Sequence, residues 1–111
     1  MPTLPDDPAL AEWTARQSAA TTGDPLWRLD AYRYAAFALS LARDDVRRIS
    51  RNPVHASVAP QLLSAVASIS ANLAEGYGRS TIADRVRFMS YALGSVREAG
   101  VWYDAALGAL P

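Results

Sequence analysis

Arginine is the residue whose type and spacing suggest chemistry in this sequence. Every cationic side chain is an arginine and none is a lysine, and a guanidinium group makes planar, bidentate contacts with phosphates or carboxylates. Arg43, Arg47 and Arg51 recur every four residues, with Arg48 alongside, so the first three share one side of a helix. Such a ridge can follow the phosphates of a nucleic acid.

Other features favour the alternative that this ridge is a solvent-exposed face of the helix that binds no ligand. Asp44 and Asp45 lie within it, the formal net charge of the chain is zero, and no aromatic residues alternate with the arginines, as stacking surfaces for bases require. The helix dipole also favours cations near the C-terminal end of a helix.

Arg85 and Arg87 lie near a predicted helix start, where cations oppose the helix dipole. Their position therefore indicates a binding partner, although the negative charge of Asp84 partly offsets them. The nucleic-acid-binding candidates are Arg43, Arg47, Arg48, Arg51, Arg85 and Arg87.

The sequence does not favour catalysis. His55 is the only histidine and cysteine is absent, whereas a metal site needs three or four converging ligands. Asn72 and Glu75 could suggest acid–base chemistry, but no nucleophile or second carboxylate accompanies them. The segment 76–79 lacks the preceding strand and the lysine of a phosphate-binding loop. We therefore expect no enzymatic activity, no metal and no cofactor.

Helices must position these residues. Turn-forming residues divide the chain at 22–25, 51–53 and 76–80, and apolar residues recur at helical spacing between them. The predicted helices cover residues 26–50, 57–75 and 81–108, and residues 1–25 form an N-terminal extension or a short helix. At 111 residues the chain has room for one domain, 1–111. The predicted fold class is an all-α, up-and-down helical bundle.

Short local signals predict how these helices begin and end. Asp7 is expected to cap a helix in the N-terminal segment, and Ser57 is expected to cap the predicted helix at 57–75. Thr81 and Asp84 resemble a capping box. Gly76 is predicted to end the helix at 57–75 in the left-handed conformation. Glu75 precedes Arg79 by four residues, so an ion pair between them should brace the turn.

The predicted helix at 81–108 has two apolar stripes. A heptad contains Ile82, Val86, Met89, Leu93, Val96, Gly100, Tyr103 and Leu107. An adjacent stripe contains Phe88, Ala92, Ser95, Ala99, Trp102 and Ala106. A surface helix normally has one such stripe, so two stripes in so short a chain predict self-association. We expect the heptad to be buried, and Leu93→Asp therefore to unfold the protein. Gly94 and Gly100 lie in the middle of this predicted helix, and they predict that a neighbouring helix approaches it closely there.

Residues 61–98 contain a series of short motifs: Ser68-Ile69, Asn72-Leu73-Ala74-Glu75-Gly76, Gly78-Arg79, Arg87-Phe88 and Gly94-Ser95-Val96-Arg97-Glu98. In types and spacing this series resembles the 23S rRNA intervening-sequence protein family, also called four-helix bundle proteins. One departure is Ser64-Ala65, where members usually have Arg-Ala. The structural motif residues are Asn72, Glu75, Gly76, Gly78, Arg79, Gly94, Ser95 and Glu98.

The resemblance implies a four-helix bundle and a homo-oligomer, for which a pentameric ring is the arrangement known in the family. It also implies RNA, DNA or a nucleic-acid-handling protein as partner, because relatives in diversity-generating retroelements act with nucleic acid and reverse transcriptase. Members carry a further C-terminal helix that this sequence lacks room for after Glu98. Either the segment 7–20 or a neighbouring subunit is expected to take its place.

We therefore expect a non-catalytic, oligomeric helical scaffold that binds a macromolecule, RNA or DNA, through arginine-lined surface. The alternative is a structural or protein–protein interaction module that does not bind nucleic acid. The start of the sequence has no export signal, and no run of about eighteen apolar residues could cross a membrane. Together with the absence of cysteine, this predicts a cytoplasmic protein without a membrane partner.

Overall fold

The computed structural model describes residues 7–111, which form helices and turns without a strand. Three long helices dominate it: α3 (Asp30–Ser50), α4 (Val58–Tyr77) and α5 (Ile82–Ala105). The shorter elements are α1 (Pro8–Ala15), α2 (Ala19–Thr22), and the 3-10 turns η2 (Pro25–Arg28) and η3 (Leu107–Ala109). The predicted all-α fold class is confirmed.

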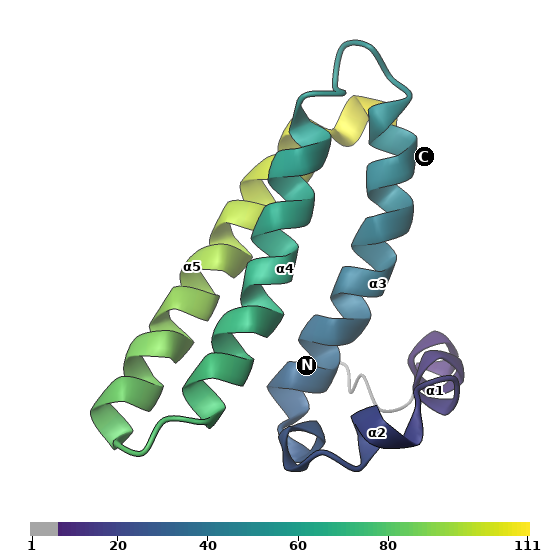
Figure 1. Ribbon diagram of the computed structural model, residues 1–111. Helices are drawn as coiled ribbons and strands as arrows, with labels where there is room; N and C mark the ends of the chain where they lie inside the picture. The colour runs from purple at the N-terminus through teal and green to yellow at the C-terminus, as the bar shows by residue number, and fades with distance from the viewer. Residues whose placement is uncertain (1–6) are drawn as a thin grey trace.

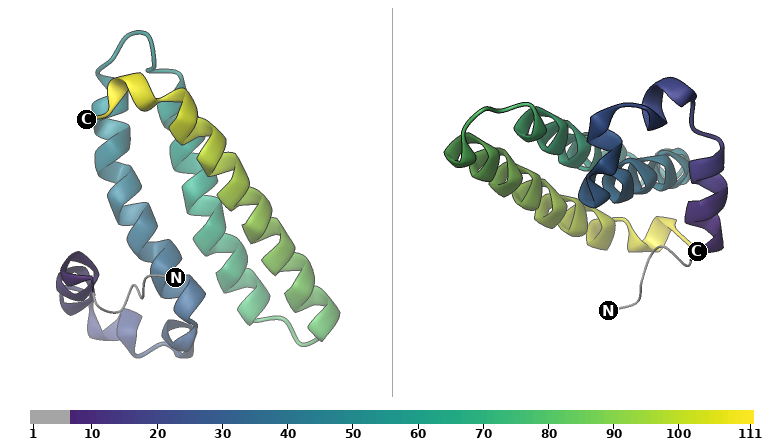
Figure 2. Two further views of the ribbon diagram at one scale, coloured as in Figure 1. Left: turned by 180° about the vertical axis from the view of Figure 1, so that it is seen from behind. Right: turned by 90° about the horizontal axis from the view of Figure 1, so that it is seen from below.

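The three long helices run alternately up and down (Figure 1). Both α3 and α5 pack against α4, and they diverge from each other toward the α4–α5 turn (Figures 1 and 2). At the opposite end the Tyr103 hydroxyl of α5 donates a hydrogen bond to Asp45 Oδ2 of α3 at 2.6 Å. Burial raises the pKa of Tyr103, and the hydrogen bond to Asp45 and its negative charge act in the same direction. This contact joins α3 to α5 where they converge.

The core between these helices is thin because alanine supplies much of it. One buried cluster lies toward the α3–α4 loop, and Ile49 and Leu62 are its largest fully buried side chains. A smaller cluster contains Ala35, Leu73 and Ala92. Burying one Leu or Ile side chain contributes roughly 1.5–3 kcal/mol, so few residues provide most of the apolar stabilisation.

Two of the three predicted N-terminal caps are confirmed. The Asp7 carboxylate accepts a hydrogen bond from the Ala9 amide at 2.8 Å, and Thr81 Oγ1 accepts one from the Asp84 amide at 3.2 Å. The prediction for Ser57 was wrong, because this residue is itself helical in backbone conformation and its side chain makes no capping bond. The helix expected from residue 26 begins at Asp30, since residues 25–28 form a separate 3-10 turn.

Gly76 does not end α4 in the left-handed conformation, so that prediction was wrong. It is a buried residue inside α4, which continues to Tyr77 and ends at Gly78 with φ −81°. A Cβ atom placed on Gly76 would lie only 2.9 Å from Phe88 Cβ. The missing side chain at Gly76 therefore allows α5 to approach α4.

The two apolar stripes of α5 have different environments. The stripe that includes Ala92, Ala99 and Ala106 is buried. The heptad stripe is instead mostly exposed, with Ile82 at 79% and Leu93 at 49%, and of its members only Tyr103 is partly buried, packed against the larger cluster. The expectation that this heptad is buried within the protomer was wrong, because small alanine side chains bring the other face of α5 onto α4.

An apolar groove of about 410 Å³ lies between α3 and α5. Tyr34 and Ala38 of α3 form one wall, Met89 and Leu93 of α5 form the other, and Leu73 is among the α4 residues that line it. Helix α1 contributes no residue to this lining, and it lies beside α3 on the side away from α5 (Figures 1 and 2). The segment 7–20 therefore does not take the place of a further helix in this groove.

Candidate nucleic-acid interface

The arginine ridge, which we define as Arg43, Arg47 and Arg51, runs along the C-terminal half of α3 to Arg51, which caps the end of this helix. All three side chains are exposed, and successive members are about 6 Å apart along the helix axis, close to the spacing of consecutive phosphates in an extended strand. Arg47 pairs with Asp44 at 2.7 Å. Within residues 7–111, Arg43 and Arg51 have no ion pair. The ridge can therefore offer two uncommitted guanidinium groups.

The remaining candidate arginines do not extend this ridge. Arg48 is exposed, but it is turned about 100° around the helix from Arg47. Arg85 and Arg87 lie at the opposite end of the long helices, next to the α4–α5 turn (Figure 1). The structure thus divides the six candidates into three on α3, one at the C-cap of α3 and two on α5.

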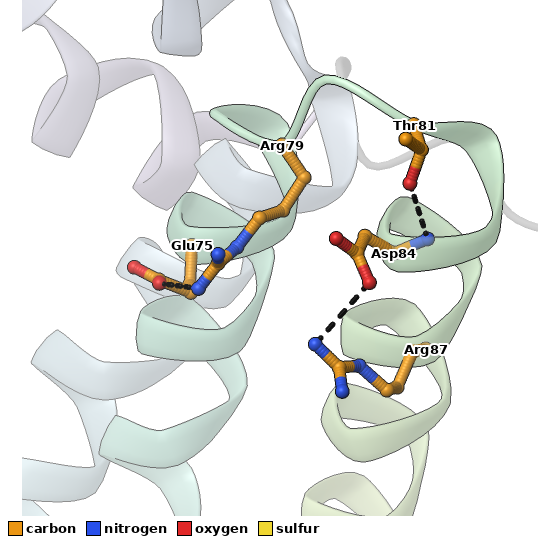
Figure 3. A network of polar contacts seen from close by, with 5 residues as sticks. All are labelled: Glu75, Arg79, Thr81, Asp84 and Arg87. Carbon is orange, nitrogen blue, oxygen red and sulfur yellow. Dashed lines mark hydrogen bonds and ion pairs between the residues drawn. The ribbon is translucent and has the colours of Figure 1, made fainter.

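Arg85 and Arg87 have partners at the α4–α5 turn. Arg85 Nε donates to the Arg79 carbonyl oxygen at 2.8 Å, and Arg87 pairs with Asp84 at 3.3 Å (Figure 3). The guanidinium groups of Arg79 and Arg87 lie 4.8 and 5.2 Å from the centre of the Phe88 ring, within the range of a cation–π contact. These arginines hold the turn together and are less available to a ligand than the ridge.

Glu75 on the last turn of α4 and Arg79 in the turn that follows form the ion pair that their spacing predicts (Figure 3). Both side chains are partly exposed, so solvent screening reduces its energy.

We expect a double-mutant cycle of Glu75→Ala and Arg79→Ala to show a coupling of about 0.3–1 kcal/mol, the range of exposed pairs at this spacing. Urea unfolding of the wild-type protein, both single variants and the double variant measures it. Because the cycle subtracts each single effect, the loss of the Arg79–Phe88 contact does not enter the coupling. Strict additivity would show that the ion pair does not brace the turn.

The other motif residues lie on helices and make local contacts. Asn72 Nδ2 donates to the Ser68 carbonyl oxygen at 2.9 Å, and Glu98 accepts a hydrogen bond from Trp102 Nε1 at 3.3 Å. Ser95 is half-buried, whereas Gly94 is exposed. A Cβ atom added to Gly94 or Gly100 would meet nothing within 4 Å. Close helix approach at these two glycines was therefore a wrong prediction within the protomer.

His55 packs against the C-terminal segment. A Cβ atom added to Gly108 would lie 3.1 Å from His55 Cε1, and the buried His55 Nδ1 has no hydrogen-bond partner in residues 7–111. No cluster of three or more histidine, cysteine, aspartate or glutamate residues that could hold a metal ion occurs in that part of the chain.

A cavity walled by aromatic side chains adjoins the ridge. We call it the aromatic cavity: it has a volume of about 310 Å³, and its lining includes Trp13, Trp27, Tyr32 and Arg43. This volume is at the lower end of the range for small-molecule sites, roughly 300–1,000 Å³. Because Arg43 is also the first residue of the ridge, the ridge leads to this cavity.

The N-terminal segment positions the aromatic wall. The rings of Trp13 on α1 and Trp27 on η2 stack with their centres 5.8 Å apart, and Trp13 also contacts Phe37 of α3 at 5.4 Å. Asp24 accepts a hydrogen bond from the Leu26 amide at 2.9 Å, which fixes the start of η2. The folded N-terminal segment thus carries aromatic rings to the first arginine of the ridge.

Sequence reasoning did not identify these aromatic residues as part of a site. Trp13 and Trp27 precede Arg43 by thirty and sixteen residues, so the search for aromatic residues between the arginines did not include them. A signal was present, because two tryptophans in a short polar segment need apolar contacts when that segment folds.

The family model described as 23S rRNA-intervening sequence protein matches residues 34–109. No curated protein and no solved structure matches the chain. None of the helices between residues 7 and 111 is long and apolar enough to span a membrane.

Proposed function

Because the chain belongs to the 23S rRNA-intervening sequence protein family, we propose that it is a non-catalytic, oligomeric helical scaffold that binds RNA or DNA through the arginine ridge. The family description supports a role connected with RNA. The mechanism is electrostatic docking: the ridge replaces counterions along the phosphate backbone, and no bond is made or broken.

The observation that carries this proposal is the position of the ridge beside the aromatic cavity. Arg43 belongs to both, so groups that bind phosphates and groups that stack on bases are adjacent. Proteins that bind single-stranded nucleic acid combine these two features. The sequence-based objection to the ridge, that aromatic residues are not interleaved with it, does not apply to the folded chain.

Self-association is the second part of the proposal, and the exposed heptad of α5 supports it. Ile82, Val86, Met89, Leu93 and Val96 are all exposed, and their spacing places them on one face of the helix. Soluble monomers rarely expose large contiguous apolar patches. A homo-oligomer, with the pentameric ring of the family as the proposed form, would bring several ridges together, and this multivalency would strengthen weak individual contacts.

A protein-interaction module is the second candidate function, and the apolar groove between α3 and α5 favours it. A groove between two helices can accept the apolar face of a third helix, here from another protein. The two candidates predict different responses to salt, because only nucleic-acid binding requires counterion release.

The proposal places the protein in the cytoplasm, where RNA and DNA are available to it. The absence of cysteine from the chain is compatible with a reducing compartment.

Replacing Arg43, Arg47 and Arg51 together with Gln should weaken binding to any nucleic acid, whatever its sequence, while the helical content stays unchanged. The slope of log affinity against log salt should flatten by roughly 0.7–0.9 for each phosphate contact removed. Fluorescence anisotropy with a labelled oligonucleotide at several salt concentrations measures both effects.

The matched control replaces Arg16, Arg28 and Arg97 with Gln, because these exposed arginines lie outside the ridge and their loss changes the net charge equally. An equal loss of affinity in the control would show that only the total charge matters. If the wild-type protein does not bind even at low salt, the ridge is a solvated face and the protein-interaction function takes first place.

A further inference from the structure

We propose that the aromatic cavity receives an unstacked nucleobase from a single strand of nucleic acid, with the adjoining phosphate against Arg43. This inference rests on the proposed function and adds to it, because the ridge by itself binds phosphates without distinguishing a single strand from a duplex.

The walls of the cavity fit a base. Trp13, Trp27 and Tyr32 line it, with Trp13 and Trp27 stacked on each other, and stacking on aromatic side chains tolerates any base because every base has a π face. The volume of about 310 Å³ suits a small planar group better than a peptide helix. The walls therefore favour a flat, aromatic ligand.

The polar groups of the lining point to the same ligand class. Gln17, Ser40 and Ser70 line the cavity among the aromatic rings. Gln17 Nε2 and Ser40 Oγ donate to the Trp13 and Phe37 carbonyl oxygens, and the Gln17 Oε1 and Ser40 Oγ atoms can still accept hydrogen bonds from the edge of a base. The Ser70 hydroxyl is buried and has no hydrogen-bond partner in residues 7–111. A buried hydroxyl without a partner is unfavourable, so Ser70 is an unsatisfied polar group next to the cavity.

The charge at the cavity supports a base that is attached to a phosphate. Arg43 lines the cavity and has no ion pair within residues 7–111. Arg47 follows one turn later on α3 and Arg51 lies at its C-cap, so a strand whose base occupies the cavity has further phosphate contacts along the ridge. An apolar ligand would make no use of these three arginines.

A single strand is the expected source of this base. In a duplex the bases are paired and stacked, and a base enters a protein pocket only if it is first flipped out, which is unfavourable. Bases in single-stranded segments are already available for stacking on aromatic side chains. The cavity therefore selects single strands over duplexes.

The test uses the full chain with Trp102→Phe, so that tryptophan fluorescence reports only Trp13 and Trp27. Four probes are compared: a short single-stranded RNA, an abasic strand of the same length, the corresponding duplex, and a free nucleoside monophosphate. We expect the single strand to quench the fluorescence and to bind about 5- to 150-fold more tightly than the abasic strand, the range for stacking one base.

Two variants test the cavity itself. Trp27→Ala should remove most of the preference for the strand with bases and leave the affinity for the abasic strand unchanged, whereas Trp27→Phe should retain part of the preference. Because loss of Trp27 could disturb the N-terminal segment, Ala36→Leu provides a second route: Ala36 lines the cavity, and a larger side chain fills it without removing a wall. Ala71→Leu, on an exposed part of α4, is the matched control and should have no effect.

The possible results separate this inference from the proposed function. Equal binding of the abasic and the complete strand would overturn base insertion and leave the ridge as the binding surface. Equal quenching by the duplex would also overturn it. If no strand binds at low salt, the proposed function fails, and quenching by the nucleoside monophosphate in that case would assign the cavity to a free nucleotide and overturn its role in strand binding.

Discussion

Leu93→Asp is expected to convert the proposed oligomer into a folded monomer. Leu93 lies in the middle of the exposed heptad of α5, which we propose as the contact with a second copy of the chain. Burying a carboxylate without a partner in that contact costs several kcal/mol, so association should weaken by roughly a hundredfold or more, at about 1.4 kcal/mol for each factor of ten. Light scattering at several protein concentrations measures the mass, and circular dichroism checks the helical content.

Tyr91→Asp is the matched control for this change. Tyr91 is 50% exposed, almost the same as Leu93, but residues two positions apart lie on different faces of a helix. The control variant should therefore keep the mass of the wild-type protein. A wild-type monomer would contradict self-association, and an unchanged mass of the Leu93→Asp variant would place the contact elsewhere. Unfolding of that variant at all concentrations would mean that the heptad is part of the protomer core.

Gly76→Val is expected to destabilise the protein by about 2–3 kcal/mol, within the range of overpacked core sites. The new Cβ would lie 2.9 Å from Phe88 Cβ, and that atom is attached directly to the backbone of α5. Relief of this overlap therefore requires the two helices to separate. Replacing glycine with valine also improves helix propensity less than replacing it with alanine would. Thermal unfolding at a fixed protein concentration should show a midpoint lower by on the order of 10 °C.

Gly78→Ala tests whether the effect is specific to the close approach. Gly78 is exposed and ends α4 with a φ of −81°, and a Cβ there would meet only the Glu75 carbonyl oxygen at an ordinary 3.8 Å. We expect a change within about 0.5 kcal/mol, as at other exposed positions. Wild-type stability of Gly76→Val would show that α4 and α5 are not held this closely in solution.

The sequence was sufficient for the three long helices and for several local contacts. Apolar residues at helical spacing predict the long helices, because a helix buries one face whatever its neighbours are. The Thr81 cap and the Glu75–Arg79 ion pair were also predictable, because each depends on residues that are three or four positions apart in the sequence. The motifs of residues 61–98 also identified the family that the match to residues 34–109 shows.

Helix packing could not be predicted in the same way. The heptad of α5 has larger apolar side chains than its alanine stripe, yet the alanine stripe faces α4. Alanine allows helices to approach closely, and Gly76 gives room for Phe88 on the facing helix. Which of two apolar faces is internal depends on the shape of the partner helix, and a periodic pattern contains no information about that shape.

The candidate site shows the same division between local and tertiary information. The sequence by itself determined the ridge, because Arg43, Arg47 and Arg51 are four residues apart on one helix. Only the tertiary structure placed Trp13 and Trp27 beside Arg43 and confined Arg85 and Arg87 to the opposite end of the long helices. The physical reason is that helical periodicity fixes the relative directions of side chains within one helix, whereas contacts between distant segments depend on how their surfaces fit together.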